Sequence, residues 1–262
     1  MQRRQVHLEG EMRTALKRIA QRVMGRISIP LEIESLRRNI SALETRLAWT
    51  EKRLHNRRWA AVEEMADYLT GARIEGDYCE FGVYRGDTFG YVCRITALSA
   101  ALRHMKCFAF DSFQGLPRPR NIDAQNGYTS NFQEGDFACS KKEFEENLRA
   151  QGIDMTRVRI IEGWFQDTLS GQMATAVGIE KIAAAWIDGD LYESTVPVLR
   201  FLSQRLSVGS IVLFDDWRVF RNLPHRGEQR ACTEWLKENP QISLRELFSF
   251  GHHGAAFTVA SC

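Results

Sequence analysis

The sequence predicts an α/β protein with a largely parallel sheet, preceded by a helical arm. From about residue 60, short apolar runs of strand type alternate with stretches of helical pattern, which is typical of repeated βα units. Before residue 60, apolar residues recur every three or four positions, as they do along one face of a helix. Acidic residues directly follow two of the apolar runs, at Asp188 and Asp215. We therefore expect them at the sheet edge where open α/β folds bind ligands.

Composition predicts a soluble, cytoplasmic protein of one large domain plus an appendage. The chain has 262 residues, 44% of them hydrophobic, and no apolar run approaches the roughly 18–20 residues of a membrane span. Residues 1–62 carry 14 Lys and Arg against 6 acidic residues, whereas the remainder is acidic overall. Six cysteines form no C-x-x-C pair, which indicates buried free thiols in a reducing compartment. We expect no nucleic-acid partner.

Residues 1–59 are predicted to form a basic helical arm. The pattern over 6–24 gives one apolar face with a basic flank, which is either solvated or contacts a membrane surface or an acidic partner. After Pro30, apolar residues from Ile33 to Leu54 alternate spacings of three and four, with Thr50 as the polar exception. This heptad seam predicts either an oligomerising arm, and so a homo-oligomer, or a helix packed along its own domain. Residues 60–262 form the second predicted domain.

The second domain begins with a predicted helix over 60–70 and a strand over Asp77–Phe81. The strand runs into the glycine-containing turn Gly82–Gly86, and a helix is expected from Thr88 to Arg103. Further strands are predicted at 106–110, 158–161, 182–187 and 211–214, and further helices at 140–151, 194–206 and 227–238. Ser140 and Glu143 form a capping box that starts the first of these helices. The tail predicts an antiparallel hairpin of strands near 244–248 and 255–260.

The turn after the first strand contains Glu80-x-Gly82-x-x-x-Gly86. Glycines there allow a ligand to approach the backbone closely, and the helix that follows presents amides to an anion. The motif is not G-x-G-x-x-G, which disfavours a nicotinamide cofactor. Asp111 ends the next strand, where an acidic residue accepts hydrogen bonds from ribose hydroxyls. The alternative for Asp111 is a cap for the bend that follows it.

Four carboxylates follow two neighbouring strands of the predicted sheet. Asp188 and Asp190 come after one strand, and Asp215 and Asp216 come after the next. They would repel one another unless they share a cation or a proton, and oxygen ligands without a His or Cys cluster favour Mg²⁺. Turn and capping roles alone are the alternative. The polar connection Leu116–Cys139 is long enough to predict a lid over the substrate.

Together these motifs resemble the macrocin O-methyltransferase family, bacterial sugar O-methyltransferases that use S-adenosylmethionine. The resemblance is carried by five blocks in the family's order: CEFGVYRG (79–86), FAFDSFQGLP (108–117), EGWFQDTL (162–169), WIDGDLYEST (186–195) and SIVLFDDW (210–217). It implies a class I methyltransferase fold, which is a Rossmann-like sheet of order 3-2-1-4-5-7-6 with the last strand antiparallel, and a bound Mg²⁺. The arm up to about residue 60 lies outside the matching blocks.

The resemblance also implies roles for individual residues. Asp188, Asp215 and Asp216 match the family's metal ligands, and Asp190 matches its proposed base, so Asp188 and Asp190 are the implied catalytic pair. For Trp164 and Phe165, which would lie near the adenine, ordinary core packing is the alternative. The implied contacts with the cofactor come from the strand ends: Glu80, Gly82, Tyr84, Arg85, Gly86, Asp111, Ser112, Gly163, Trp164, Phe165 and Asp188.

The implied reaction is an in-line methyl transfer from a sulfonium to a hydroxyl that a cation makes more acidic and a carboxylate deprotonates. Two hydroxyls that bind one cation together would make the acceptor a vicinal diol. A sugar or glycoside, a non-sugar diol such as a catechol, and a scaffold that binds cofactor without catalysis all remain open. His225 is expected at the surface or on the substrate, and His252 and His253 are weak metal candidates.

Overall fold

The computed structural model describes residues 33–44, 56–124 and 132–262. The chain divides into two compact units, Met1–His55 and Asn56–Cys262, so the second unit begins slightly before the predicted boundary at residue 60. The predicted basic helix at 6–24 and the end of the heptad seam lie outside the described residues. None of the described helices is long and apolar enough to cross a membrane.

In the first unit, residues 33–44 form a helix. Leu36, Ile40 and Leu43 are exposed by 58%, 47% and 60%, and their spacing places them on one face. The seam therefore includes a genuine apolar stripe over these residues. Its use in self-association stays a prediction.

The second unit is built on one seven-stranded sheet of order β3-β2-β1-β4-β5-β7-β6. The first five strands are parallel, and β7 runs antiparallel to both of its neighbours. The predicted order and the terminal hairpin are confirmed. The strands are β1 (Asp77–Phe81), β2 (Cys107–Asp111), β3 (Val158–Glu162), β4 (Ile182–Ile187), β5 (Ile211–Phe214), β6 (Ser243–Phe250) and β7 (Gly254–Ser261).

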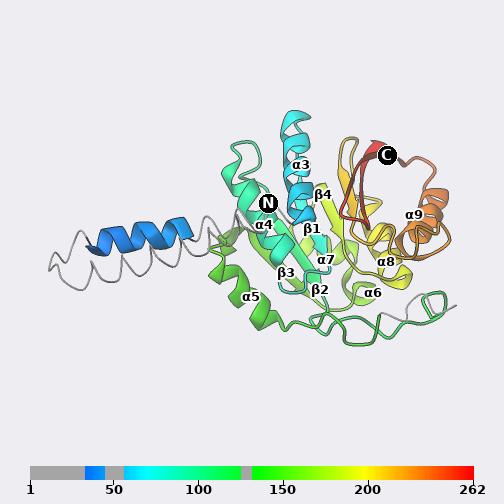
Figure 1. Ribbon diagram of the computed structural model, residues 1–262. Helices are drawn as coiled ribbons and strands as arrows, with labels where there is room; N and C mark the ends of the chain where they lie inside the picture. The colour runs from blue at the N-terminus through cyan, green and yellow to red at the C-terminus, as the bar shows by residue number, and fades with distance from the viewer. Residues whose placement is uncertain (1–32, 45–55, 125–131) are drawn as a thin grey trace, which may run out of the picture. The chain divides into compact units, whose positions relative to one another are not determined.

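Helices cover both faces of this sheet (Figure 1). On one face, Tyr78 of β1 packs against Phe89 of α4, and Phe89 packs against Phe144 of α5. On the other face, Cys79 and Phe81 join the apolar cluster of α8 and α9. The helices are α3 (Arg57–Gly71), α4 (Asp87–Leu98), α5 (Lys141–Ala150), α6 (Phe165–Thr168), α7 (Gly171–Val177), α8 (Tyr192–Leu202) and α9 (Gly227–Glu238), with a 3-10 turn η2 (Met155–Arg157).

β4 and β5 are apolar throughout because both of their faces are covered. All six residues of β4 are buried, and the core on the α8 side includes Trp235 of α9. The cysteines are free, and five of the six are buried, as predicted. Ser140 caps α5 by accepting a hydrogen bond from the amide of Glu143, which confirms the predicted start of that helix.

Several elements differ from the sequence-based expectation: α3 begins at Arg57 rather than at residue 60, and α8 ends at Leu202 rather than at residue 206. α4 ends at Leu98 rather than Arg103, because the chain turns at Ser99, whose backbone is extended. The short helices α6 and α7 were not predicted, since neither is long enough to show a periodic pattern. α8 begins at Tyr192 rather than Ser194, because Asp123, which is distant in the sequence, caps its first turn.

Candidate active site

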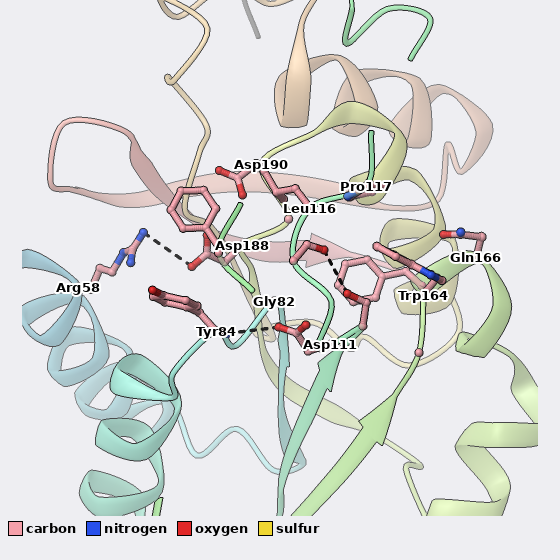
Figure 2. A pocket seen from close by; sticks show the side chains of 17 residues that line it. Arg58, Gly82, Tyr84, Asp111, Leu116, Pro117, Trp164, Gln166, Asp188 and Asp190 are labelled. Atoms are coloured by element: carbon pink, nitrogen blue, oxygen red, sulfur yellow. Dashed lines mark hydrogen bonds and ion pairs between the residues drawn. The ribbon is translucent and has the colours of Figure 1, made fainter. Parts of the chain in front are cut away.

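A cavity of about 250 Å³ opens where the strand order reverses, at the carboxyl ends of β1, β2, β3 and β4 (Figure 2). This is the switch point at which doubly wound sheets bind ligands. Eight of the eleven residues predicted to hold a cofactor line it: Gly82, Tyr84, Asp111, Ser112, Gly163, Trp164, Phe165 and Asp188. Asp190 lines it as well, and the lid segment contributes Leu116, Pro117 and Phe137.

Gly82 brings the ends of β1 and β4 into contact. Its φ is +90°, and a Cβ placed there would lie 1.9 Å from the carbonyl oxygen of Asp188. The amide of Asp188 in turn donates to the carbonyl of Phe81 at 2.8 Å. Only glycine satisfies both the backbone conformation and this approach. The cofactor turn and the acidic turn are therefore held together by direct backbone contact.

Asp111 uses its carboxylate to hold two loops. One oxygen accepts hydrogen bonds from the amides of Val83 at 2.8 Å and Tyr84 at 3.2 Å, and the other accepts from Phe113 at 2.7 Å. Burial raises the pKa of Asp111, and these backbone donors oppose that shift. The two interpretations of Asp111 are thus compatible, because it caps the bend while it lines the cavity.

Three of the predicted cofactor residues do not line the cavity: Glu80, Arg85 and Gly86. Arg85 lies 3.6 Å from Glu143 in an exposed ion pair. A Cβ on Gly86 would lie 2.8 Å from the Phe144 ring, so this glycine serves the packing of α5. Glu80 is 1% exposed, and the Tyr78 hydroxyl donates to its carboxyl group. Contact of these three residues with a cofactor stays a prediction.

Burial raises the pKa of Glu80 to about 8, which makes the stability of the fold depend on pH. Between about pH 5 and 8 the unfolded chain has released this proton and the folded chain has kept it, so stability falls as pH rises. We expect Glu80→Gln, which cannot titrate, to remove part of that fall. In urea unfolding at pH 5.5 and 7.5, the wild type should lose about 2 kcal/mol more than the variant. Glu64→Gln, at an exposed position of α3, should behave like the wild type, and equal pH dependence in all three proteins would contradict the prediction.

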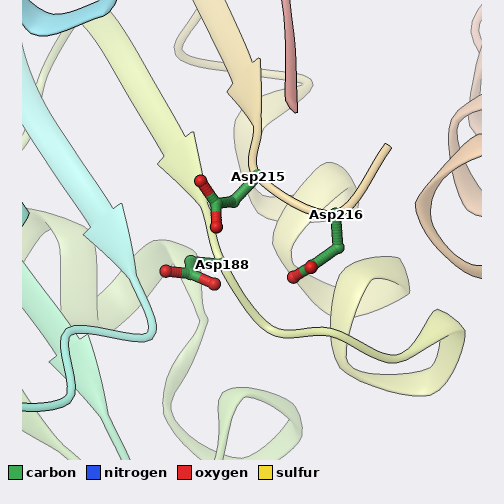
Figure 3. Close-up of side chains that lie close together, drawn as sticks. All are labelled: Asp188, Asp215 and Asp216. Carbon is green, nitrogen blue, oxygen red and sulfur yellow. The ribbon is translucent and has the colours of Figure 1, made fainter. Parts of the chain in front are cut away.

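The acidic residues after β4 and β5 meet in one cluster (Figure 3). Asp188, Asp215 and Asp216 each offer an oxygen, and these oxygens lie within 4.8 Å of one another. Asp215 and Asp216 are buried, and burial together with neighbouring carboxylates raises the pKa of Asp188 and Asp216. Within the described ranges, no second group of His, Cys, Asp and Glu side chains has ligand geometry, and His252 and His253 are not part of this one.

These residues fit a hard divalent cation. The Oδ2 atom of Asp216 is buried and has no hydrogen-bond partner among the residues that the structure describes. Glu228 of α9 lies behind it, with one oxygen accepting from the Asp216 amide at 3.0 Å and the other buried without a described partner. Buried carboxylate oxygens without partners are costly, and oxygen-only ligands are those that Mg²⁺ prefers.

Asp190 lies in the turn between β4 and α8. It is 9% exposed and has a φ of +57°, an uncommon backbone conformation for a residue with a side chain. Burial and the charges of Asp188 and Asp215 raise the pKa of Asp190 to about 8. A carboxylate whose pKa lies near neutrality is suited to take up a proton and release it again.

Sequence reasoning missed Arg58, which it assigned to the basic arm. Arg58 lies in the first turn of α3, lines the cavity and reaches the acidic cluster. Its Nε donates to Asp215 Oδ1 at 2.9 Å, its Nη2 donates to Asp215 Oδ2, and its Nη2 lies 3.7 Å from Asp188. Glu228 was missed as well, because nothing in its spacing sets it apart from a solvated helix residue.

The lid segment is tied to the start of α8. Asp123 is 4% exposed, and its two oxygens accept hydrogen bonds from the amides of Tyr192 at 3.0 Å and Glu193 at 3.1 Å. Arg226 donates to the carbonyl of the preceding residue, Ile122, at 2.8 Å. The residue before α8, Leu191, offers no side-chain cap. A cap supplied by a distant loop therefore lets the helix begin two residues earlier than predicted.

Phe132, in the same connection, packs on Phe220 at a ring distance of 6.1 Å. His225 is exposed, as expected. Burial raises the pKa of Asp215, and the nearby charges of Arg58 and His253 oppose that rise.

Comparison with known proteins agrees with this geometry. Residues 10–238 match the sequence profile described as macrocin-O-methyltransferase. The chain is 31% identical over 174 residues to demethyldecarbamoylnovobiocin O-methyltransferase of Streptomyces niveus, covering 64% of this chain and 61% of that one. It is 30% identical over 178 residues to 8-demethyl-8-(2,3-dimethoxy-alpha-L-rhamnosyl)-tetracenomycin-C 4'-O-methyltransferase of Streptomyces olivaceus, with the same coverage. The matches thus span about three fifths of the length of these relatives.

Among solved structures, the O-methyltransferase NovP superposes with a TM-score of 0.61 at 26% identity, covering 77% of this chain and 79% of NovP. The shared architecture is the class I methyltransferase fold, in agreement with the observed strand order.

Proposed function

Because the chain belongs to the macrocin O-methyltransferase family, we propose that it transfers a methyl group from S-adenosylmethionine to a hydroxyl of a sugar or a glycosylated small molecule. The observation that carries this proposal is the position of the Asp188, Asp215 and Asp216 cluster beside the switch-point cavity. A cation and a nucleoside cofactor would thereby lie in one cleft, as metal-assisted methyl transfer requires.

The cavity supplies groups suited to each part of the cofactor. Gly82 lines the cavity where the methionine end would lie, and Asp111 lines it where the ribose would lie. Trp164 and Phe165, both at the cavity wall, offer apolar surface to the adenine. The bound cofactor supplies an electrophilic methyl group on a sulfonium, so the work of the protein is to align the acceptor oxygen with it.

The acidic cluster orients and activates the acceptor. Asp188, Asp215 and Asp216 would hold Mg²⁺, whose charge makes a neighbouring hydroxyl more acidic. A carboxylate oxygen of Asp190 then accepts the hydroxyl proton. Asp190 lines the cavity and follows Asp188 by two residues, which supports its role as the base beside the proposed metal ligands.

A sugar acceptor is supported by the names of the relatives. One of them acts on a rhamnosyl group according to its name, and it shares 30% identity with this chain over 178 residues. The lid residues Leu116, Pro117 and Phe137 at the cavity wall are positioned to contact such an acceptor.

We expect methyl transfer to depend on a divalent cation and on Asp216. The assay measures transfer of labelled methyl from S-adenosylmethionine to a panel of nucleotide sugars, glycosides and catechols. With the preferred acceptor, EDTA should abolish turnover and Mg²⁺ should restore it. Asp216→Asn should lower kcat at least about a hundredfold, because it weakens an oxygen-only cation site.

Asp67→Asn, at an exposed position of α3, is the matched control and should retain full activity. Full turnover in EDTA would contradict the role of the cation. Methylation of catechols but of no sugar would contradict the acceptor class. Cofactor binding by calorimetry without transfer to any acceptor would favour a non-catalytic scaffold.

A further inference from the structure

Arg58 binds the same carboxylate that the proposed metal site needs. Its guanidinium forms a bidentate (two-pronged) contact with Asp215, in which Nε and Nη2 each donate to a different oxygen. The negative charge of the third ligand candidate, Asp216, also raises the pKa of Arg58. Asp188, Asp215 and Asp216 together raise the pKa of Arg58 against the opposing effect of burial, so the arginine remains charged.

The position of this arginine is fixed by its helix. Arg58 follows the cap residue Asn56, whose side chain accepts hydrogen bonds from the amides of Arg58 and Trp59. Trp59 is 1% exposed and stacks on Tyr91 of α4 at a ring distance of 4.3 Å. The first turn of α3 is thus anchored on both sides of the arginine, and the side chain is directed to the acidic cluster in Figure 2.

A divalent cation and this guanidinium cannot both be accommodated favourably. Mg²⁺ binds carboxylate oxygens at about 2.1 Å. Arg58 already donates to both oxygens of Asp215. A cation bound to either oxygen would therefore put its own charge and that of the guanidinium within about 3 Å of the same carboxylate oxygen. Close like charges repel strongly in a partly buried site, so one of the two must leave.

We propose that Arg58 is a built-in counter-ion of the acidic cluster, which a divalent cation must displace from Asp215 before it can bind. This inference rests on the proposed metal site and adds a residue that regulates its occupancy. In the absence of the cation, Arg58 relieves the repulsion among the carboxylates. When the cation binds, the side chain swings away from Asp215.

Cation affinity tests the competition directly. Mn²⁺ binding to the full-length apo protein is measured by electron paramagnetic resonance and by calorimetry, without any methyl-transfer substrate. We expect Arg58→Gln to bind Mn²⁺ at least tenfold more tightly than the wild type. Arg58→Lys, which keeps the charge but lacks the two-pronged contact, should lie between them. The neighbouring exposed Arg57→Gln removes the same charge from the same helix turn and should stay within twofold of the wild type.

The displacement itself is measured in the wild-type protein, so the test does not depend on the variants folding. The Nε–H group of Arg58, held on a carboxylate, should give a resolved ¹⁵N–¹H NMR signal that Arg58→Lys lacks. Saturating Mg²⁺ should move this signal to the position of a solvent-exposed arginine. A signal that stays unchanged under saturating Mg²⁺, or Mn²⁺ affinity in Arg58→Gln equal to or below that of the wild type, would overturn the proposal.

The outcomes also separate this inference from the proposed function. Tighter cation binding in Arg58→Gln without transfer to any acceptor supports the competition and contradicts only the function. Equal cation binding in both proteins overturns the competition alone. If neither protein binds a divalent cation, Arg58 is the permanent cation of the cluster, and both the competition and the metal requirement fail.

Discussion

Asp190→Asn is expected to lower kcat by about 10²–10⁴-fold while cofactor affinity changes less than twofold. The substitution keeps the size and the turn geometry of the residue but removes the group proposed to accept the acceptor's proton. Asparagine also tolerates the left-handed backbone conformation found there, with a φ of +57°, so the fold should be preserved. Single-turnover methyl transfer and calorimetry with S-adenosylmethionine measure the two quantities.

Asp167→Asn is the matched control for this change. Asp167 is an exposed acid on α6, the short helix that begins with the cavity residue Phe165. Its substitution makes the same Asp-to-Asn change without removing the proposed proton acceptor, so kcat should stay near the wild-type value. Retention of more than a tenth of kcat in Asp190→Asn would assign the proton transfer to another group.

Gly82→Ala is expected to destabilise the protein by about 2–4 kcal/mol and to abolish cofactor binding in the fraction that folds. A methyl group at this position would lie 1.9 Å from the Asp188 carbonyl oxygen, and the φ of +90° is unfavourable for alanine. The backbone fixes where the Cβ lies, and the oxygen that it meets is a backbone atom, so no change of rotamer relieves the overlap. Urea unfolding gives the stability, and calorimetry gives the cofactor affinity.

Gly135→Ala separates the cost of the steric overlap from the cost of the positive φ. Gly135 has a nearly equal φ of +84°, but a Cβ there would meet no atom within 4 Å. Its substitution should therefore carry only the conformational cost, about 1–2 kcal/mol. If the two variants lost equal stability, the contact between the ends of β1 and β4 would not constrain position 82.

The fold could be predicted because its signals are local and repeated. β4, with the sequence IAAAWI, is buried on both faces, and an unbroken apolar run of that length is typical of a central parallel strand. The capping box at Ser140 likewise lies within one turn of the helix it starts. The limits of α4 and the short helices α6 and α7 could not be predicted in this way, because tertiary packing rather than periodicity decides them.

The site was predicted where its residues follow strands and missed where they do not. Asp188 and Asp215 stand at strand ends, so the parallel topology alone brings them together. Arg58 reaches the cluster from a helix that precedes the first strand, and no spacing in the sequence links it to a residue 157 positions away. Glu80 lies near the end of β1, but the alternation of the strand turns its side chain towards Tyr78 rather than into the cavity, and its contact with a cofactor stays a prediction.

The cap that Asp123 provides for α8 has a consequence for redesigning this protein. The loop that would be exchanged to change the acceptor also supplies the hydrogen bonds that begin the helix after Asp190. A loop grafted from a relative with different specificity would therefore disturb the catalytic turn unless it carries an acid in the place of Asp123 and keeps the backbone contact with Arg226. We therefore expect chimeras to fold best when they exchange the loop and the start of α8 together.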